Sequence, residues 1–224
     1  MSEKISKSVL GAGIYIVSDI SSLLNIPKHK VRRYLSLWDA RMGQPYFEET
    51  FTWSAGKNIK AVSFLTMIEL QTVFRLQELG MKPREILKAR ENITRDLHLA
   101  HPFASQNLLS DGRKLWIYIQ DAWVNTDGSK QTNVVDFVEL FAKEKLVFGH
   151  DGLAERLYPS GRRSKIVVDP HHQFGQPVIE GTNIMAAAIF SMYQSGEQVE
   201  QISRLYDLEI EWINEAIQFY KQAA

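Results

Sequence analysis

Apolar residues at helical spacing between positions 15 and 38 predict two short helices joined by a tight turn. Ser18 is the expected N-cap of the first helix. The turn falls at residues 25–27, because Pro27 lacks an N–H group and suits the first turn of the following helix. The apolar face of the second helix follows the spacing i, i+3, i+4 and i+7 and consists of Val31, Tyr34, Leu35 and Trp38.

The opposite face of the second helix is basic and polar. It carries Lys28, His29, Lys30, Arg32, Arg33 and Ser36. A basic helix held by its apolar side against a shorter helix is typical of a helix-turn-helix, whose second helix enters the major groove of DNA. Arginine can bind guanine edges or phosphates through two parallel hydrogen bonds, and lysine adds a cation for phosphate. These six residues are therefore the predicted DNA contacts; the alternative is a helix that is merely basic on its solvent side.

Two strand-like segments on either side of a polar turn at residues 54–58 predict a β-hairpin after the helix pair. Its place in the chain favours the wing of a winged helix. Lys57 and Lys60 would then lie at or near the tip, within reach of a phosphate group. The alternative is an ordinary hairpin with a solvated loop.

A long helix capped by Ser63 and ended by Gly80 is expected next, followed by a helix that starts near Pro83. The order of helix-turn-helix, wing and a helix ending in FRLQELGMKPREILK resembles the DNA-binding domain of the MerR family over residues 14–92. MerR proteins usually continue into a long dimerising helix, whereas this chain breaks at His101-Pro102. A dimer must therefore use another surface.

The middle of the chain changes character. β-Prone residues between positions 107 and 124, with a turn signal at Asp111-Gly112, predict a small antiparallel meander. An amphipathic helix is expected over residues 136–145, and a short helix followed by a polar turn over residues 149–165. That turn carries a small basic cluster, for which a solvated linker is favoured over a nucleic-acid contact; the cluster consists of Arg162, Arg163 and Lys165.

The last segment of the chain has the most specific pattern. It reads Ile166-x-x-Asp169-Pro170 and then Gly175-x-Pro177-x-Ile179-x-Gly181-Thr182-x-Ile184. Two short strands around this turn should precede three helices that again have a helix-turn-helix shape, the first capped by Thr182 or Asn183. The third helix begins with Glu209 and Glu211, so it would repel phosphate. An acidic surface with nearby aromatic side chains suits a protein partner or a dimer interface better; those aromatic residues are Trp212, Phe219 and Tyr220.

The pattern over residues 166–220 resembles the small domain of VapB-type antitoxins and of relatives without an assigned function. The whole arrangement resembles the larger VapB-type antitoxins, which place a helix-turn-helix ahead of that domain. This resemblance implies an antitoxin of a type II toxin–antitoxin system. Such a protein binds operator DNA as an autorepressor and neutralises a co-encoded toxin, here a PIN-type ribonuclease. The expected partners are double-stranded DNA, a second copy in a homodimer and the toxin.

The predicted fold is mainly α within the α+β class, with three domains. Residues 1–95 form a MerR-like winged helix-turn-helix, and residues 96–165 form a connector with a small central β-meander. Residues 166–224 form an antitoxin-like, homeodomain-like domain of three helices with a short β-hairpin.

Composition changes this picture in two ways. The chain has no cysteine, no apolar run long enough to cross a membrane and no long apolar leader, which predicts a cytoplasmic protein. Residues 1–95 carry 15 Lys and Arg against 9 Asp and Glu, whereas residues 96–224 carry 11 against 17. The two halves are therefore expected to bind different partners, and the acidic half could cover a basic RNA-binding surface of the toxin.

No catalytic, cofactor-binding or metal-binding residues are predicted, and no enzyme activity is expected. His171 and His172 lie beside Asp169, but adjacent strand residues point to opposite faces and cannot easily ligate one ion. One alternative function is a MerR-like one-component transcription regulator whose C-terminal half binds a small effector. The other is a structural adaptor without a role on DNA.

Overall fold

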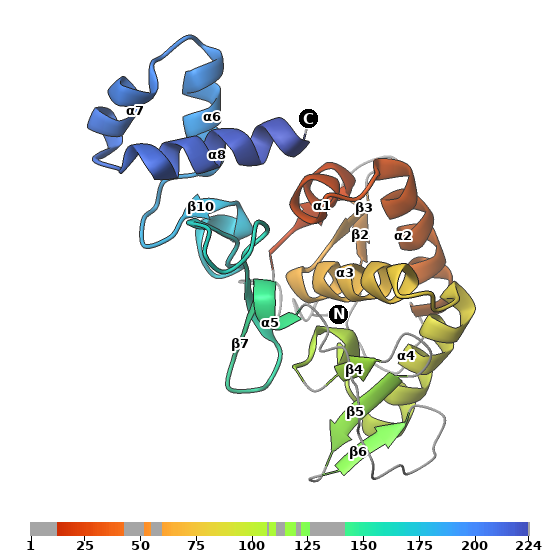
Figure 1. Ribbon diagram of the computed structural model, residues 1–224. Helices are drawn as coiled ribbons and strands as arrows, with labels where there is room; N and C mark the ends of the chain where they lie inside the picture. Colours follow the sequence, from red (N-terminus) through yellow and green to blue (C-terminus); the bar gives the residue numbers. More distant parts are fainter. Residues whose placement is uncertain are drawn as a thin grey trace, which may run out of the picture. The chain divides into compact units, whose positions relative to one another are not determined.

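The computed structural model describes residues 13–42, 52–54, 60–106, 108–110, 115–119, 122–125 and 142–223. Within these ranges the chain is mainly helical and carries small antiparallel sheets (Figure 1). The contacts divide the chain into two compact units. The first unit is assembled from Met1–Leu37, Thr52–Phe64 and Arg156–Ala224, and the second from Trp38–Phe51 and Leu65–Glu155.

The N-terminal part of the first unit holds the two predicted helices and a small sheet. Its elements are β1 (Tyr15–Ile16), α1 (Val17–Leu24), α2 (Lys28–Met42, of which the first unit includes residues up to 37), β2 (Thr52–Ser54) and β3 (Lys60–Val62). The sheet has the order β1-β3-β2 and is antiparallel throughout. Strands β2 and β3 confirm the predicted hairpin, whereas β1 was not predicted. Because Tyr15 pairs with Val62, far along the chain, no local pattern reveals this strand.

The C-terminal part of the first unit contains short strands followed by three helices. Its elements are β9 (Ile166–Val167), the 3₁₀ turn η2 (Gln173–Gly175), β10 (Val178–Ile179), α6 (Ala186–Gln194), α7 (Val199–Tyr206) and α8 (Ile210–Ala223). Strands β9 and β10 pair antiparallel, as predicted. Gly196 follows α6 with a φ of 97°, in the left-handed region that glycine adopts readily.

The short helix predicted within residues 149–165 is wrong. The structure instead forms β8 (Ala154–Leu157), which pairs with β7 (Leu146–Phe148). Ala154 and Leu157 are buried while the two residues between them are exposed. Leu157 also exchanges backbone hydrogen bonds with Val168, at N···O distances of 2.9 and 2.8 Å. Pairing with distant backbone thus overrides the local helical tendency.

Two predicted helix caps are also wrong. α1 begins after Ile16, whose N–H donates to the Asp19 carboxylate at 3.0 Å, so Ser18 lies inside the helix. α6 begins after Met185, several residues beyond Thr182 and Asn183. The Thr182 hydroxyl closes a turn ahead of the helix, because it donates to the Ile179 carbonyl and accepts the Ile184 N–H.

The second unit pairs two long helices. Its elements are α3 (Phe64–Glu78, from residue 65 on), α4 (Pro83–Leu97), the 3₁₀ turn η1 (Pro102–Ala104), β4 (Leu108–Ser110), β5 (Leu115–Ile119), β6 (Ala122–Asn125), α5 (Ala142–Lys145) and β7. Strands β4, β5 and β6 form the predicted antiparallel meander. Gly80, with a φ of 98°, follows α3 and Pro83 opens α4, both as predicted. α5 confirms the end of the predicted helix over residues 136–145, whose earlier part lies outside the described residues.

A buried ion pair joins α3 to α4 and to the chain that follows. The Glu69 carboxylate receives two hydrogen bonds from the Arg90 guanidinium, at 3.0 and 2.7 Å. It also accepts the Phe103 N–H at 3.1 Å and lies 3.2 Å from Nδ1 of His101. α4 ends at Leu97, and this network holds the following residues against the two helices. The chain therefore turns back after α4, at the break predicted for His101-Pro102.

Candidate nucleic-acid interface

α1 and α2 are joined by a tight turn built from local hydrogen bonds. Asn25 ends α1 in the left-handed conformation, with φ 53° and ψ 47°. The Ser21 hydroxyl donates to the Ile26 carbonyl at 2.7 Å, and the Ile26 N–H donates back to the Ser21 carbonyl at 3.1 Å. Pro27 precedes α2, and its carbonyl accepts the N–H groups of Lys30 and Val31. Asparagine tolerates this left-handed position better than most residues do, so the sequence itself defines the angle of the turn.

The inner side of α2 is closed to solvent. Val31 and Leu35 are fully buried, and Tyr34 is 6% exposed. On the neighbouring helix Ile20 is fully buried, as are Ala61 and Val62 of β3. The Trp38 side chain, predicted for the same face, lies outside the described part of the chain. The apolar face predicted from the spacing is thus confirmed at its three described positions.

The outer side of α2 brings the predicted helix contacts together. All six are exposed: Lys28, His29, Lys30, Arg32, Arg33 and Ser36. Lys28, Arg32 and Ser36 follow one another one turn apart, and His29 and Arg33 form a parallel row. At 1.5 Å per residue the first row spans about 12 Å, a length that suits a helix in a major groove. No acidic residue occurs between Asp19 and Asp39 in the sequence, so nothing on this stretch opposes phosphate.

The hairpin after α2 is described only in part. Strands β2 and β3 pair through Thr52 and Val62, Trp53 and Ala61, and Ser54 and Lys60. The tip at residues 55–59, which includes Lys57, lies outside the described residues. Lys60 is placed in β3 by its backbone, but its side chain is not described. The predicted wing contacts of Lys57 and Lys60 therefore stay predictions.

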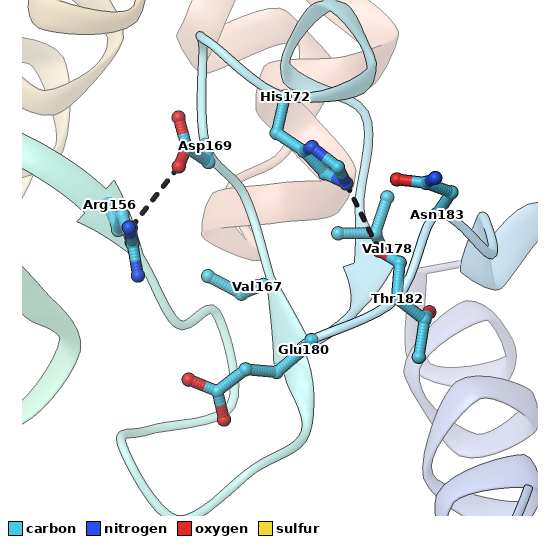
Figure 2. Close-up of a pocket in the computed structure, with 9 residues that line it drawn as sticks. Arg156, Val167, Asp169, His172, Val178, Glu180, Thr182 and Asn183 are labelled. Carbon is cyan, nitrogen blue, oxygen red and sulfur yellow. Dashed lines mark hydrogen bonds and ion pairs between the residues drawn. The ribbon is translucent and has the colours of Figure 1, made fainter.

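A polar cavity of about 310 Å³ lies in the C-terminal part of the first unit, where no site was predicted (Figure 2). Arg156 pairs with Asp169 on its left side in Figure 2, with Nε 3.2 Å from a carboxylate oxygen, and Nε2 of His172 lies 3.0 Å from the Thr182 carbonyl. On its lower side in Figure 2 is Glu180, which pairs with Lys165 at 3.8 Å. Both carboxylates of the cavity thus face a cation, which leaves its charge balanced.

The histidine pair beside this cavity does not converge on a common point. His172 reaches the Thr182 carbonyl, whereas the His171 ring is largely exposed and lies 3.7 Å from Asp169. Among the described residues no group of His, Cys, Asp and Glu side chains is placed to hold a metal ion. In the same residues no helix combines the length and the apolar character needed to span a bilayer.

The aromatic residues predicted to lie on the acidic C-terminal surface are largely covered. Phe219 is 7% exposed, and Tyr220 stacks on Phe190 with ring centroids 5.4 Å apart. Trp212 is half-buried beneath the Lys165 ammonium, which lies 5.1 Å from the ring centroid. That part of the prediction is wrong for Phe219, whereas Trp212 and Tyr220 are partly exposed. The large apolar side chains exposed around α7 and α8 are Leu205 and Ile210, at 64% and 41%.

Comparison with known proteins finds similarities for the C-terminal segment and for the fold. Residues 166–220 match a family of proteins of unknown function, DUF433. The chain has no match among curated proteins. It is similar to the X-ray crystal structure of Rv2018 from Mycobacterium tuberculosis, with a TM-score of 0.63 and 16% sequence identity over 91% of this chain and 96% of that chain. At this identity the likeness concerns the fold alone.

Proposed function

We propose that this chain is the antitoxin of a type II toxin–antitoxin system, which binds operator DNA as an autorepressor and neutralises a co-encoded PIN-type ribonuclease. Residues 1–95 act as a winged helix-turn-helix, and a homodimer reads a palindromic operator. The observation that carries the DNA-binding half is the exposed basic face of α2, opposite a buried apolar face. The antitoxin half rests on the motif resemblance of residues 166–220, since the matching family has no assigned function.

The charge distribution supports two different partners, one for the basic surface and one for the acidic surface. The exposed cations of α2 provide the electrostatic attraction that dominates binding to DNA. Arg32 and Arg33 can each make bidentate contacts with guanine or phosphate. Residues 197–211 carry five carboxylates and a single cation, Arg204, so this segment suits a basic protein surface.

The DNA-binding half is tested by fluorescence anisotropy on DNA from upstream of the chain's own gene, over a series of salt concentrations. Arg32→Ala/Arg33→Ala should weaken binding by roughly 2–6 kcal/mol if both arginines read bases. If both bind only phosphate, the slope of log K against log salt should instead fall by about two.

A matched control replaces the other exposed arginine pair, in Arg162→Ala/Arg163→Ala, and should bind the operator like the wild-type chain. If the α2 variant kept wild-type affinity and the control variant lost affinity, the DNA contact would be made by the turn before β9 and not by α2. Absence of sequence-specific binding by the wild-type chain would remove the repressor half of the proposal.

A one-component regulator that binds a small effector is the second candidate, and the polar cavity of Figure 2 favours it. Its Arg156 and Asp169 side chains pair with each other, and a small polar molecule that carries both charges can replace that contact. A rise in Tm with one class of small polar metabolite, lost in Arg156→Ala, would support this candidate over the antitoxin.

A further inference from the structure

The first unit contains the same helix–turn–helix backbone twice. α1 and α7 are both eight residues long, and each is followed by a left-handed residue with nearly the same angles. These residues are Asn25, at φ 53° and ψ 47°, and Asp207, at φ 53° and ψ 48°. α2 begins three residues after the first, and α8 begins three residues after the second.

The hydrogen bonds of the two turns repeat as well. Ser203 donates from its hydroxyl to the Leu208 carbonyl at 2.6 Å, and the Leu208 N–H donates to the Ser203 carbonyl at 3.1 Å. Ser21 and Ile26 make the same pair of bonds in the first copy. The buried positions also correspond, because Ile202 and Ile213 are fully buried in the second copy as Ile20 and Val31 are in the first.

The outward positions of the second helix differ in chemistry. Where α2 exposes Lys28 and His29, α8 exposes Ile210 and Glu211. The counterparts of Arg32 and Arg33 are the neutral Asn214 and the acidic Glu215. Glu215 is occupied within the domain, since it accepts the Lys165 N–H at 2.7 Å and the Ser164 hydroxyl at 3.0 Å. The second copy has the same scaffold and carries no cation at these four positions, so it lacks the charges that attract DNA.

The two copies differ in the exposure of one leucine in the first helix of the scaffold. Leu23 of α1 is 6% exposed and lines a small cavity together with Phe219 and Tyr220 of α8. Its counterpart in α7 is Leu205, which is 64% exposed. In the first copy this face is therefore covered by another part of the protein, and in the second copy the equivalent leucine is open to solvent.

We propose that the α7–α8 corner docks a basic segment of a partner protein that presents an apolar side chain between its cations. The corner is defined as Leu205, Asp207, Glu209, Ile210 and Glu211, all of which are exposed. Leu205 and Ile210 flank the turn and offer apolar contact area, while the three carboxylates around them select a positively charged surface. This inference rests on the proposed function, because it assigns the surface that meets the toxin.

The same charges exclude the other occupants. DNA would be repelled by the carboxylates. A second copy of the chain, placed symmetrically on this corner, would bring like charges face to face around the two-fold axis. A basic protein segment with an apolar side chain can pack against the exposed leucine and isoleucine and pair its cations with the carboxylates.

The test uses the full chain and the product of the neighbouring gene, purified separately, with the dissociation constant measured by calorimetry. Leu205→Ser/Ile210→Ser should raise the dissociation constant by about tenfold or more, as expected for exposed apolar anchors of an interface. Glu209→Lys/Glu211→Lys should have an effect at least as large, and wild-type affinity should fall as salt rises. Both variants should bind operator DNA like the wild-type chain, which shows that they fold.

Two matched controls make the same kinds of substitution outside the α7–α8 corner. Phe174→Ser removes another exposed apolar side chain, and Glu155→Lys reverses another exposed charge. Both should leave the dissociation constant within about twofold of the wild-type value. Normal binding by the corner variants would overturn the inference and leave the proposed function standing. Failure of the wild-type chain to bind the neighbouring product would overturn the inference and the toxin half of the proposed function together.

Discussion

At the scale of single residues, Gly175 lies directly against the side chain of Tyr15. A Cβ atom at this position would overlap the Tyr15 hydroxyl oxygen, far inside van der Waals contact. Tyr15 is 1% exposed, and its hydroxyl has no hydrogen-bond partner among the described residues. Burial and the nearby Asp169 and Asp19 carboxylates raise the pKa of this tyrosine above its ordinary value of 10.0. Glycine thus lets the loop after β9 close over β1.

Gly175→Ala should therefore destabilise the protein by about 2–4 kcal/mol, as the sum of the left-handed backbone term and the overlap with Tyr15. The measurement is urea unfolding at neutral pH.

Gly181→Ala is the matched control, because Gly181 has the same φ of 78° and no atom within 4 Å of the added methyl group. It should lose only about 1–2 kcal/mol. Tyr15→Phe, which removes the nearest oxygen, should recover part of the stability lost in Gly175→Ala. Equal losses in the two alanine variants would contradict the contact.

Single residues differ in how well the sequence predicts them. The exposed cations of α2 follow from helical spacing alone, and the structure confirms their exposure. The caps of α1 and α6 were misplaced, because Asp19 reaches back to Ile16 and because the Thr182 hydroxyl closes a turn. The role of Tyr15 depends on Gly175, which no local pattern connects with it. The Lys57 and Lys60 side chains fall outside the described residues, so their contacts stay predictions.

At the scale of elements, the Glu69–Arg90 pair holds α3 and α4 together and turns the chain back after them. Burial alone would raise the pKa of Glu69, but Arg90 and His101 reverse this and hold the pKa below its ordinary value of 4.5. A depressed carboxyl pKa stabilises the folded state above the ordinary value, and that contribution is lost as the pH falls below it.

Glu69→Gln should therefore lower the free energy of unfolding at pH 7 by roughly 3–5 kcal/mol, since it leaves Arg90 buried without its counter-charge. It should also flatten the fall in stability below about pH 4.5. Urea unfolding at a series of pH values measures both effects.

Glu155→Gln, at an exposed position of β8, should change stability by less than about 0.5 kcal/mol at any pH. If Glu69→Gln kept the wild-type dependence on pH, the buried pair would not contribute to acid stability.

Most helices and strands could be predicted at this scale because each has its own periodicity or turn residue. The failures were β1, β7 and β8, three short strands that exist only through their partners, since β7 pairs with β8. β1 pairs with β3, and Leu157 of β8 pairs with Val168. Sequence patterns report local preference, and such strands are decided by contacts with distant backbone.

At the scale of the whole molecule, the two candidate surfaces belong to the same unit. The basic face of α2 and the acidic α7–α8 corner both lie in the unit that combines the beginning and the end of the chain. The opposite charges visible in the sequence predicted two kinds of partner. The repeated helix–turn–helix scaffold beneath them was not predicted beyond its general shape, because the two copies share few identical residues.

The discontinuous make-up of the first unit affects the order in which the protein matures on the ribosome. Tyr15 and α1 are synthesised early, but Gly175 and α8, which cover them, emerge more than a hundred residues later. At the usual rates of translation this delay is on the order of 10 s. During that time the nascent helix pair lacks the cover over Tyr15 and Leu23. The basic N-terminal helix pair is therefore fully packed only after the acidic C-terminal segment has been synthesised. A protease that removes the C-terminal segment would expose Tyr15 and Leu23 again.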